Sequence, residues 1–338
     1  MYIVHFIPNL NIGGAEKFLL TLTQELSLNG FDSTIVVFSL TKTRNILGSR
    51  AKVISIFSKD FLRLLLSNKK KRIALYWLAY AQSLSAFTGI FFDKNIWLVR
   101  RTSIEFKTLS FKSWVSSMVN IPLSYLIPNS IVYCADVAKT HHESKLYCSK
   151  NGLVIHNFVT THCLKIRDGV KRQKIKCIFV GKDSKAKNVN LLIQIFAALG
   201  SRYSCDLYGG DLVDSNRQLV KRMGGNKSLR LMGSVNDLSF RYHEYDCLIS
   251  TSTTEGFPNA IAEAVASGLP VIATNVGDTA AIVEGSGVLI DNFRLDQFLS
   301  AVRHIGSSNF DPRIMHENTQ KKFSKEQIVK KYIGLLNV

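Results

Sequence analysis

Short apolar runs alternate with segments of helical period through both halves of this 338-residue chain. In the first half, strands are predicted at 2–7 and 33–38, with a helix at 16–29 between them. The second half repeats this order, with strands at 176–180 and 204–208 around a helix at 189–199. Such alternation is typical of βαβ units, whose strands form parallel sheets. The pattern therefore predicts an α/β protein.

The length of the chain favours two domains, since one hydrophobic core seldom organises so many residues. The stretch 165–174, KIRDGVKRQK, separates the two series of predicted elements and is dense in charge. It has too little apolar content for a core element, so we expect the interdomain linker there. The predicted domains are 1–165 and 166–320, followed by a final helical segment at 321–338.

The 20 residues from 73 to 92 carry no formal charge and follow a basic run at 69–72. This length is enough to cross a bilayer. Polar residues dilute the stretch, however, and the α/β pattern offers a place for a buried strand and helix, which is the favoured interpretation. The helix-period segment at 57–66, beside the basic run, can form a patch on a membrane surface. A solvated loop is the alternative there.

The net charge is +18, and the basic residues are unevenly distributed. Residues 1–165 hold 20 Lys and Arg against 8 Asp and Glu, whereas residues 166–338 hold 23 against 17. Such a surplus suits nucleic acid, anionic lipid or a phosphate-bearing substrate, and charge alone does not choose among them. No recognition-helix, RRM or zinc-finger pattern occurs, so we do not expect nucleic acid as a partner.

The six cysteines are widely spaced, with no C-x-x-C pair and no histidines at zinc-ligand spacing. This usage is typical of reduced thiols in a cytosolic protein. The amino-terminal sequence, MYIVHFI, lacks the basic region and cleavage site of a signal peptide and is predicted to be a first buried strand. We therefore expect a cytoplasmic protein.

The densest pattern of the chain runs from residue 246 to residue 290. It predicts a strand at 247–250, a polar loop at 251–254, a helix at 259–266 and a strand at 271–273. Ligands of such sheets bind at the carboxyl ends of the strands. The loop 255–259, EGFPN, precedes the helix, where free backbone amides can hold an anion.

Glu255 and Glu263 are eight residues apart, and Glu263 is predicted about one turn inside the helix that Glu255 precedes. Both can face one ligand, because a carboxylate accepts hydrogen bonds from neighbouring sugar hydroxyls. One glutamate would then hold a ribose and the other a hexose. Two unrelated surface charges are the alternative.

This stretch resembles the E-x7-E signature of the family 4 retaining glycosyltransferases, which have the fold called GT-B. The resemblance implies two facing Rossmann-like domains with parallel sheets and an interdomain cleft, and a final helix that packs back towards the first domain. It also implies transfer of a sugar from a nucleotide diphosphate sugar, with UDP favoured and GDP possible, and no further cofactor. The expected acceptor is a lipid-linked glycan of a surface polysaccharide or lipopolysaccharide.

Several other segments carry the same resemblance. The loop 12–16, IGGAE, is similar to the family's glycine loop, and 154–159, VIHNFV, to the segment that closes the first domain, with Asn157 at the usual asparagine. The segments 207–210 and 230–233 fit two further strands. Lys187 matches a family lysine, whereas Lys182 stands where the family usually has arginine.

The resemblance assigns catalytic roles to Glu255, Lys187 and Lys182. Donor contacts are expected from a larger group, which consists of Gly13, Gly14, Gly181, Lys182, Lys187, Ser252, Glu255, Gly256, Phe257, Pro258, Asn259 and Glu263. Gly277 and Asp278 follow the next strand, where a turn and a donor contact are equally compatible with the sequence.

The sequence departs from the family in its first domain, where many relatives have a catalytic histidine after a strand. Residues 96–104, IWLVRRTSI, contain none, which leaves Arg100, Arg101, Thr102 and Ser103 as polar candidates. His5 is predicted in a strand, His141 and His142 on a helix surface, and His156 beside the linker; none is predicted to be a catalytic base. No D-x-D motif occurs, so we expect lysines and backbone amides, rather than a metal, to offset the phosphate charge.

Other functions remain compatible with the pattern: a nucleotide-sugar epimerase of the same fold, a non-catalytic sensor of nucleotide sugars, or a nucleic-acid-binding protein. For the transferase, we expect peripheral binding to an anionic membrane at the inner face of the plasma membrane. The expected contacts are the basic run at 69–72 and exposed aromatic side chains at Phe61, Trp77, Trp97 and Phe106.

Overall fold

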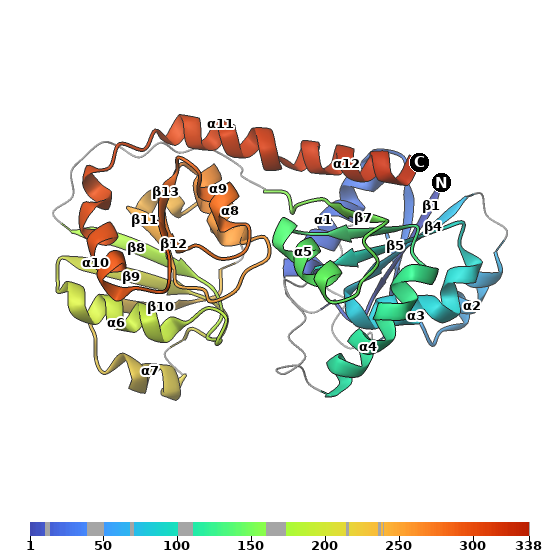
Figure 1. Cartoon of the computed structure of the whole chain (residues 1–338), viewed down its shortest axis with the longest axis horizontal. Helices are drawn as coiled ribbons and strands as arrows, with labels where there is room; N and C mark the ends of the chain where they lie inside the picture. Colours follow the sequence, from blue (N-terminus) through green and yellow to red (C-terminus); the bar gives the residue numbers. More distant parts are fainter. Residues whose placement is uncertain are drawn as a thin grey trace. The chain divides into compact units, whose positions relative to one another are not determined.

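The computed structural model describes residues 1–10, 14–38, 51–67, 71–100, 111–159, 174–213, 216–235, 238 and 240–337, without the side chains of residues 112 and 113 (Figure 1). The chain divides into two compact units. The first comprises Met1–Phe158 and Glu326–Val338, and the second comprises Val159–Lys325.

The first unit contains a seven-stranded parallel sheet in the order β3-β2-β1-β4-β5-β6-β7. Its strands are β1 (Tyr2–Ile7), β2 (Asp32–Val37), β3 (Lys52–Ser55), β4 (Arg72–Trp77), β5 (Lys94–Val99), β6 (Ser130–Tyr133) and β7 (Gly152–Val154). Its helices are α1 (Gly14–Leu28), α2 (Lys59–Leu66), α3 (Leu78–Thr88), the 3₁₀ turn η1 (Gly89–Phe91), α4 (Phe111–Leu126), α5 (Asp136–Ser144) and α12 (Lys325–Asn337).

Helices cover both faces of this sheet. Alternate residues of a strand point to opposite faces, so their contacts show which helices lie on which face. Ile3 and Ile7 of β1 belong to one apolar cluster with residues of α1 and α12. Phe6, between them, packs instead against Phe61 of α2, with ring centres 6.2 Å apart. Trp97 of β5 likewise reaches α3, where its indole nitrogen donates to the hydroxyl of Ser85 at 3.1 Å. The helices α2 and α3 therefore lie on the face opposite α1.

The carboxyl-terminal helix α12 is part of the first unit. Ile328, Val329, Tyr332 and Leu336 are buried in the same cluster as the α1 side chains. Lys94 donates a hydrogen bond of 2.7 Å to the carbonyl of Leu335, one of the carbonyls that lack a partner inside the helix. The first unit thus joins segments from both ends of the chain.

The second unit contains a six-stranded parallel sheet in the order β10-β9-β8-β11-β12-β13. Its strands are β8 (Ile175–Val180), β9 (Tyr203–Tyr208), β10 (Leu229–Gly233), β11 (Cys247–Ser250), β12 (Val271–Thr274) and β13 (Gly287–Ile290). Its helices are α6 (Val189–Leu199), α7 (Arg217–Met223), α8 (Asn259–Ala266), α9 (Thr279–Val283), α10 (Leu295–His304) and α11 (Pro312–Phe323), with 3₁₀ turns η2 (Tyr242–Glu244) and η3 (Ile305–Ser307).

These two sheets confirm the predicted α/β class, and the predicted bounds of β1, β11, α6 and α8 coincide with the observed ones. The uncharged stretch at 73–92 forms most of β4, then α3 and η1, which confirms the interpretation as a buried strand and helix. Among the described residues, no helix is long and apolar enough to cross a membrane.

The prediction of exposed aromatic residues was wrong for Phe61, Trp77 and Trp97, which are all buried, while Phe106 lies outside the described residues. Both tryptophans belong to central strands of a parallel sheet that is covered on both faces. His142 is also buried, although we predicted it on a helix surface. Its ring packs edge to face against Tyr147, with ring centres 5.3 Å apart.

Truncation of Tyr332 is expected to destabilise the first unit although the residue is close to the end of the chain. Tyr332 is fully buried, and its ring lies 6.0 Å from that of Phe18. Tyr332→Ala should lower the free energy of unfolding by about 3 kcal/mol, as for other large aromatic residues in a core. Urea unfolding followed by tryptophan fluorescence measures this, since the three tryptophans of the chain, Trp77, Trp97 and Trp114, belong to the first unit.

Lys331→Ala is the matched control, because Lys331 is the exposed neighbour of Tyr332 on α12. It should leave the unfolding curve unchanged. Equal effects of the two substitutions would contradict the role assigned to α12.

Candidate functional site

Loops that carry the predicted site residues follow two neighbouring strands of the second unit. β8 is followed by the loop 181–188, and β11 by the loop 251–258. The two strands are hydrogen-bonded neighbours in a parallel sheet, so their carboxyl ends lie at the same edge. This is the edge at which ligands of such sheets bind.

Hydrogen bonds between the two loops fix their positions. The backbone amide of Thr253 donates to the carbonyl of Ala186 at 2.7 Å. The hydroxyl of Thr251 donates to the carbonyls of Lys187 and Asn188, at 3.0 and 3.1 Å. Asn188 has a left-handed backbone conformation, with φ of 48°, directly before α6. The end of the first loop, which includes Lys187, is therefore fixed against the second loop.

Lys187 and Glu255 form an ion pair, with 2.5 Å between Nζ and Oε1. The same carboxylate oxygen accepts a hydrogen bond of 2.7 Å from the hydroxyl of Ser252. The side chains of Lys187 and Glu255 are only 26% and 13% exposed. Screening by water is therefore weaker than at an open surface, and the charge-assisted contact has a defined geometry. Three of the predicted site residues thus meet at one point.

Further contacts hold this group in place. Ser252 is fully buried, and its carbonyl accepts a hydrogen bond of 2.5 Å from Thr274 at the end of β12. The aliphatic part of Lys187 passes close to Gly181. A Cβ atom at Gly181 would lie 3.1 Å from Cγ and Cδ of Lys187. The glycine therefore leaves space for the lysine side chain to reach Glu255.

Gly277 supports the Glu255 loop from the next strand end. Its φ of +62° favours glycine, and a Cβ atom there would lie 2.3 Å from the carbonyl oxygen of Glu255. The amide of Asp278 donates to the carbonyl of Gly256 at 3.1 Å. The sequence was compatible with a turn or a ligand contact at this position, and the structure shows a turn that packs on the Glu255 loop.

The helix α8 begins directly after this loop, with Pro258 at its amino end, and no side-chain hydrogen bond from the described residues caps it there. Backbone amides of the first turn can therefore meet an anion. Phe257 is buried and packs edge to face on Phe323, with ring centres 5.1 Å apart. This contact anchors the segment 256–259, which contains Gly256, Pro258 and Asn259.

Glu263 lies one turn inside α8, as predicted. Its carboxylate accepts a hydrogen bond of 3.4 Å from the hydroxyl of Tyr242, a residue of η2. The two glutamates of the pattern thus have different partners: a lysine and a serine for Glu255, and a tyrosine for Glu263. The sequence carried no signal for Tyr242, because its proximity to α8 arises from the tertiary fold.

Lys182 is exposed and forms no ion pair within the part of the chain that the structure describes. Its neighbour Asp183 is fixed by an ion pair with Arg222 and by a hydrogen bond of 3.0 Å from its own amide to Asp211. The backbone next to Lys182 is therefore fixed, whereas the side chain of Lys182 is exposed to solvent. The structure does not bring Lys182 to Glu255 as it does Lys187.

The remaining candidates belong to the first unit. Gly14 is the first residue of α1, and Gly13 lies outside the described residues, as do Arg101, Thr102 and Ser103. Arg100 follows β5. Its guanidinium donates to the side chain of Asn157 and lies over the ring of Phe18, 4.0 Å from the ring centre. Its Nη1 atom is buried and has no hydrogen-bond partner within the described residues.

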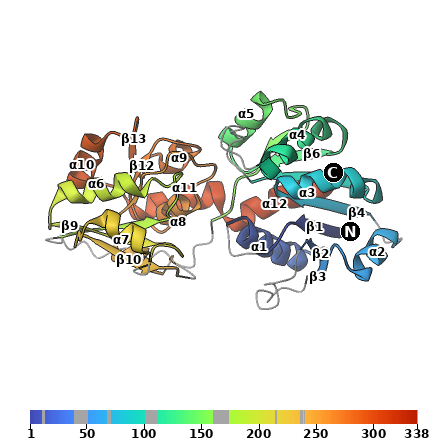
Figure 2. The same cartoon turned by 90° about the horizontal axis from the view of Figure 1, so that it is seen from below.

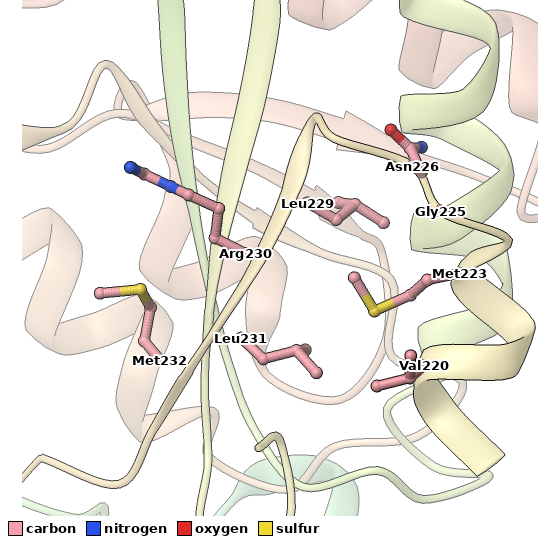
Figure 3. A pocket seen from close by; sticks show the side chains of 8 residues that line it. All are labelled: Val220, Met223, Gly225, Asn226, Leu229, Arg230, Leu231 and Met232. Carbon is pink, nitrogen blue, oxygen red and sulfur yellow. The ribbon is translucent and has the colours of Figure 1, made fainter. Parts of the chain in front are cut away.

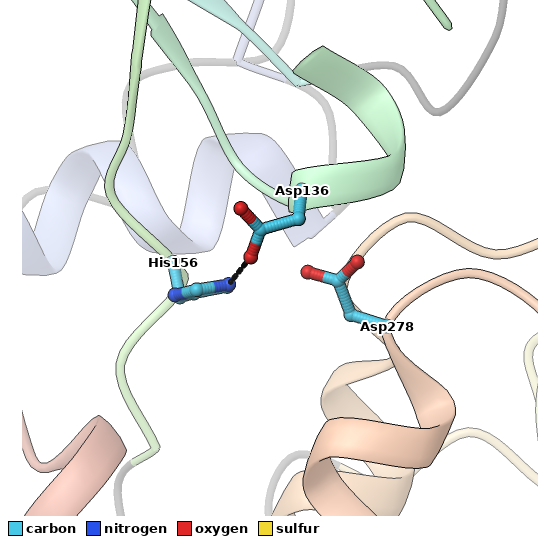
Figure 4. A group of neighbouring side chains, drawn as sticks. All are labelled: Asp136, His156 and Asp278. Carbon is cyan, nitrogen blue, oxygen red and sulfur yellow. Dashed lines mark ion pairs between the residues drawn. The ribbon is translucent and has the colours of Figure 1, made fainter. Parts of the chain in front are cut away.

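Two histidines of the first unit have different environments. His5 is fully buried in β1 and accepts a hydrogen bond of 3.2 Å from Trp77, and burial lowers its pKa to about 3. It is a neutral residue of the core. His156, after β7, forms an ion pair of 3.3 Å with Asp136 at the start of α5 (Figure 4). The sequence did not predict this pair, since Asp136 begins α5 and His156 follows β7, 20 residues later in the chain.

A separate hollow of about 380 Å³ lies between α7 and the edge strand β10 (Figure 3). Its wall is mainly apolar, and its one cationic side chain, Arg230, is held by the buried carboxylate of Asp206 at 2.7 Å. It contains none of the predicted site residues. The hollow therefore lacks the charge needed for an anionic ligand, in contrast to the group around Lys187.

Comparison with known proteins identifies the part of the chain that contains this site. Residues 174–307 match the family described as glycosyl transferases group 1. The matched residues include Gly181, Lys187, Ser252, Glu255 and Glu263. The ion pair and the E-x7-E pattern therefore lie within the segment that matches this family.

Individual relatives agree with this family. The O-antigen biosynthesis glycosyltransferase WbnH of Escherichia coli is 30% identical over 122 residues, which cover 36% of this chain and 35% of that protein. The match thus spans about a third of the length of that relative. An uncharacterized glycosyltransferase of Haemophilus influenzae is 23% identical over 292 residues, which cover 80% of this chain and 79% of that protein.

Similar solved structures establish the fold class over the whole chain. The crystal structure of Anabaena Alr3699/HepE in complex with UDP has a TM-score of 0.81 at 16% identity, and the alignment covers 100% of both chains. At this identity the likeness concerns the fold. It confirms two Rossmann-like domains with parallel sheets, as in GT-B glycosyltransferases.

Gly277→Ala should destabilise the second unit more than Gly285→Ala does. Both glycines have positive φ, +62° and +68°, so both substitutions strain the backbone. Only the Cβ atom at Gly277 meets the backbone of Glu255, whereas nothing lies within 4 Å of the one at Gly285. We expect Gly277→Ala to cost about 1–3 kcal/mol more, from overpacking. Urea unfolding followed by far-UV circular dichroism measures the difference, and equal costs would contradict the role of Gly277 as a support for the Glu255 loop.

Proposed function

We propose that this protein is a retaining glycosyltransferase that uses a nucleotide diphosphate sugar as donor. The observation that carries the proposal is the Lys187–Glu255 ion pair, held at the carboxyl ends of β8 and β11 within the segment that matches the group 1 family. UDP is the favoured nucleotide and GDP is possible. The complex of the Anabaena neighbour with UDP supports this order.

We assign each part of the donor to residues of the site according to its charge. The diphosphate is bound by Lys187, Lys182 and the backbone amides at the amino end of α8. Glu255 accepts a hydrogen bond from the transferred sugar, because it lies beside the lysine that binds the phosphate. Glu263, one turn deeper in α8, accepts hydrogen bonds from the ribose.

The ion pair prepares the site for the donor. Without a ligand, Lys187 and Glu255 neutralise each other, and Ser252 holds the carboxylate in one orientation. A diphosphate brings more negative charge to Lys187 than the single carboxylate does. Lys187 therefore turns its charge towards the phosphate, and Glu255 becomes available to a sugar hydroxyl. Little reorganisation is needed, because both side chains are already in place.

The same groups stabilise the charge that develops as the sugar leaves the diphosphate. Lys187, Lys182 and the α8 amides offset this charge, so we propose that no divalent metal is required. The acceptor oxygen bonds to the anomeric carbon on the face from which the phosphate leaves, and the leaving phosphate accepts the proton of that hydroxyl. The anomeric configuration is then retained, which nuclear magnetic resonance of the product can test.

The proposed acceptor is a lipid-linked glycan of a surface polysaccharide at the cytoplasmic face of the plasma membrane. The names of the Escherichia coli relatives, which refer to O-antigen biosynthesis, support this assignment. The strongly basic chain, with a net charge of +18, supports association with anionic lipid.

Replacement of either glutamate should lower turnover while the fold is retained. Glu255→Gln and Glu263→Gln keep the volume of the side chain but lose charge-assisted hydrogen bonds of about 1.5–3 kcal/mol, which corresponds to about one to two orders of magnitude in rate. The measurement is release of UDP from a panel of UDP-sugars, with and without EDTA, which should leave the wild-type rate unchanged. Glu284→Gln is the control, because Glu284 is an exposed glutamate of the same unit. Wild-type rates in both site variants would refute the assignment.

The lysines of one loop should differ in their effect on kcat/KM. Lys187→Ala should reduce it by about tenfold or more, since this variant removes a charged partner of the phosphate. Lys182→Ala should have a smaller effect, and Lys185→Ala, which changes an exposed lysine of the same loop, should have none. The same release assay at several donor concentrations ranks the three variants. Equal losses in all three would mean that the loop contributes only general positive charge.

A further inference from the structure

Among the described side chains of α4, in the first unit, the buried ones are polar and the most exposed ones are apolar. Its buried positions include three serines and one asparagine, which are Ser116, Ser117, Ser124 and Asn120. Its large apolar side chains that are exposed are Phe111, Trp114, Val115, Val119, Tyr125 and Leu126. A surface helix of a globular protein normally has the opposite arrangement. The outward face of α4 is therefore not adapted to water.

The helix α3 lies beside α4 (Figures 1 and 2). Its buried and exposed side chains have the same inverted arrangement. Gln82, Ser85 and Thr88 are buried, whereas Tyr80 and Phe87 are exposed. Ile90 of η1, which follows α3, is exposed as well. We call the exposed apolar residues of α3, η1 and α4 the α3–α4 face.

Hydrogen bonds fix the orientation of α4. The hydroxyl of Ser83 on α3 lies 3.0 Å from that of Ser116 and donates to the side-chain oxygen of Asn120 at 2.9 Å. The side-chain nitrogen of Asn120 donates to the carbonyl of Ala79, also at 2.9 Å. Rotation of α4 to bury its apolar side would break these bonds and leave buried polar atoms without partners, which is costly.

A loop with basic and apolar residues lies against the carboxyl-terminal part of α4. The amide of Cys148 in this loop donates to the hydroxyl of Ser124 at 2.9 Å. Leu146 is 68% exposed and has a left-handed φ of 72°, and Lys145 and Lys150 on either side of it are exposed. Between residues 106 and 135 the sequence contains no Asp or Glu. The α4 part of the α3–α4 face thus has apolar and basic surroundings, and α4 itself has no acidic residue.

We propose that the α3–α4 face docks into the surface of an anionic lipid bilayer. Exposed tryptophan and tyrosine, here Trp114, Tyr80 and Tyr125, suit the boundary between headgroups and acyl chains. Exposed lysines beside them match anionic headgroups. A second copy of the chain is a poor partner by comparison, because each copy carries a net charge of +18.

The helix lies in the plane of the membrane. α4 has 16 residues and contains Pro122, so it is shorter than a membrane-spanning helix. Its outward side chains enter the bilayer while its serines and Asn120 stay in contact with the protein. The docking surface is thus α3 and α4, in place of the buried Phe61, Trp77 and Trp97. This inference rests on the proposed function only for the acceptor, since a docked first unit would meet a lipid-linked glycan.

Trp114 makes the contact directly observable. Trp77 and Trp97 are fully buried in the sheet, whereas Trp114 is 41% exposed on α4. Vesicles of phosphatidylcholine and phosphatidylglycerol should therefore shift the fluorescence of the full-length protein to shorter wavelength. Brominated acyl chains should quench it. Phosphatidylcholine vesicles alone should have a weaker effect, because they lack negative charge.

A matched pair of variants tests the face itself. The double variant Val119→Glu, Leu126→Glu places charge on the outward side of α4, and both positions are exposed in the folded protein. It should raise the lipid concentration for half-maximal binding by about tenfold or more, as expected for the loss of two inserted apolar side chains. Leu28→Glu is the control, because Leu28 is an exposed leucine at the end of α1, the helix that packs on the other face of the sheet. It should bind vesicles like the wild type.

Each outcome is informative. An unchanged spectrum with anionic vesicles, or equal binding of the two variants, would overturn the docking surface. Dimerisation in sedimentation experiments that the double variant abolishes, without vesicle binding, would assign the face to a second copy. Hydrolysis of UDP-sugars without vesicles should be the same in both variants. If no nucleotide sugar is hydrolysed while vesicle binding behaves as expected, the proposed function fails and the docking surface remains.

Discussion

The group around Lys187 and Glu255 depends on the hydrogen bonds between two loops at one edge of a parallel sheet. Thr251 and Thr253 of the second loop donate hydrogen bonds to carbonyls of the first loop. Lys187 and Glu255, which are 68 residues apart in the sequence, are thereby held together. Without these contacts, each loop would carry a separate surface charge. With them, a lysine and a glutamate meet in a partly buried position where their interaction is strong enough to orient both.

Glycine residues allow Lys187 and Glu255 to come together. Gly181 leaves space for the stem of Lys187, and Gly277 allows the next strand end to pack against the carbonyl of Glu255. The ion pair therefore depends on residues that carry no charge themselves. The chemistry of the site resides in a few side chains, and their positions are determined by backbone packing around them.

The first unit combines a sheet covered by apolar side chains with two helices whose outer faces are apolar. The large aromatic residues of the strands are in the core, and those of α4 are at the surface. Polar residues between α3 and α4 satisfy one another, and so they hold the apolar residues outward. Burial of hydroxyl and amide groups, which is usually a cost, here determines the orientation of a surface.

The sequence by itself determined the elements whose signals are local, which are the strand β11 and the helices α6 and α8. It also placed Glu263 one turn inside α8 and Glu255 in the loop before it. Tertiary structure alone decided that Lys187 and not Lys182 reaches Glu255, that Tyr242 contacts Glu263, and that Phe61, Trp77 and Trp97 are buried. The physical reason is the distance along the chain between the residues that interact. Periodicity reports how neighbours along the chain share a face, whereas burial and ion pairing depend on which distant segments pack together. For α4, periodicity separates a polar from an apolar side, but only its hydrogen bonds to α3 decide which side faces the protein.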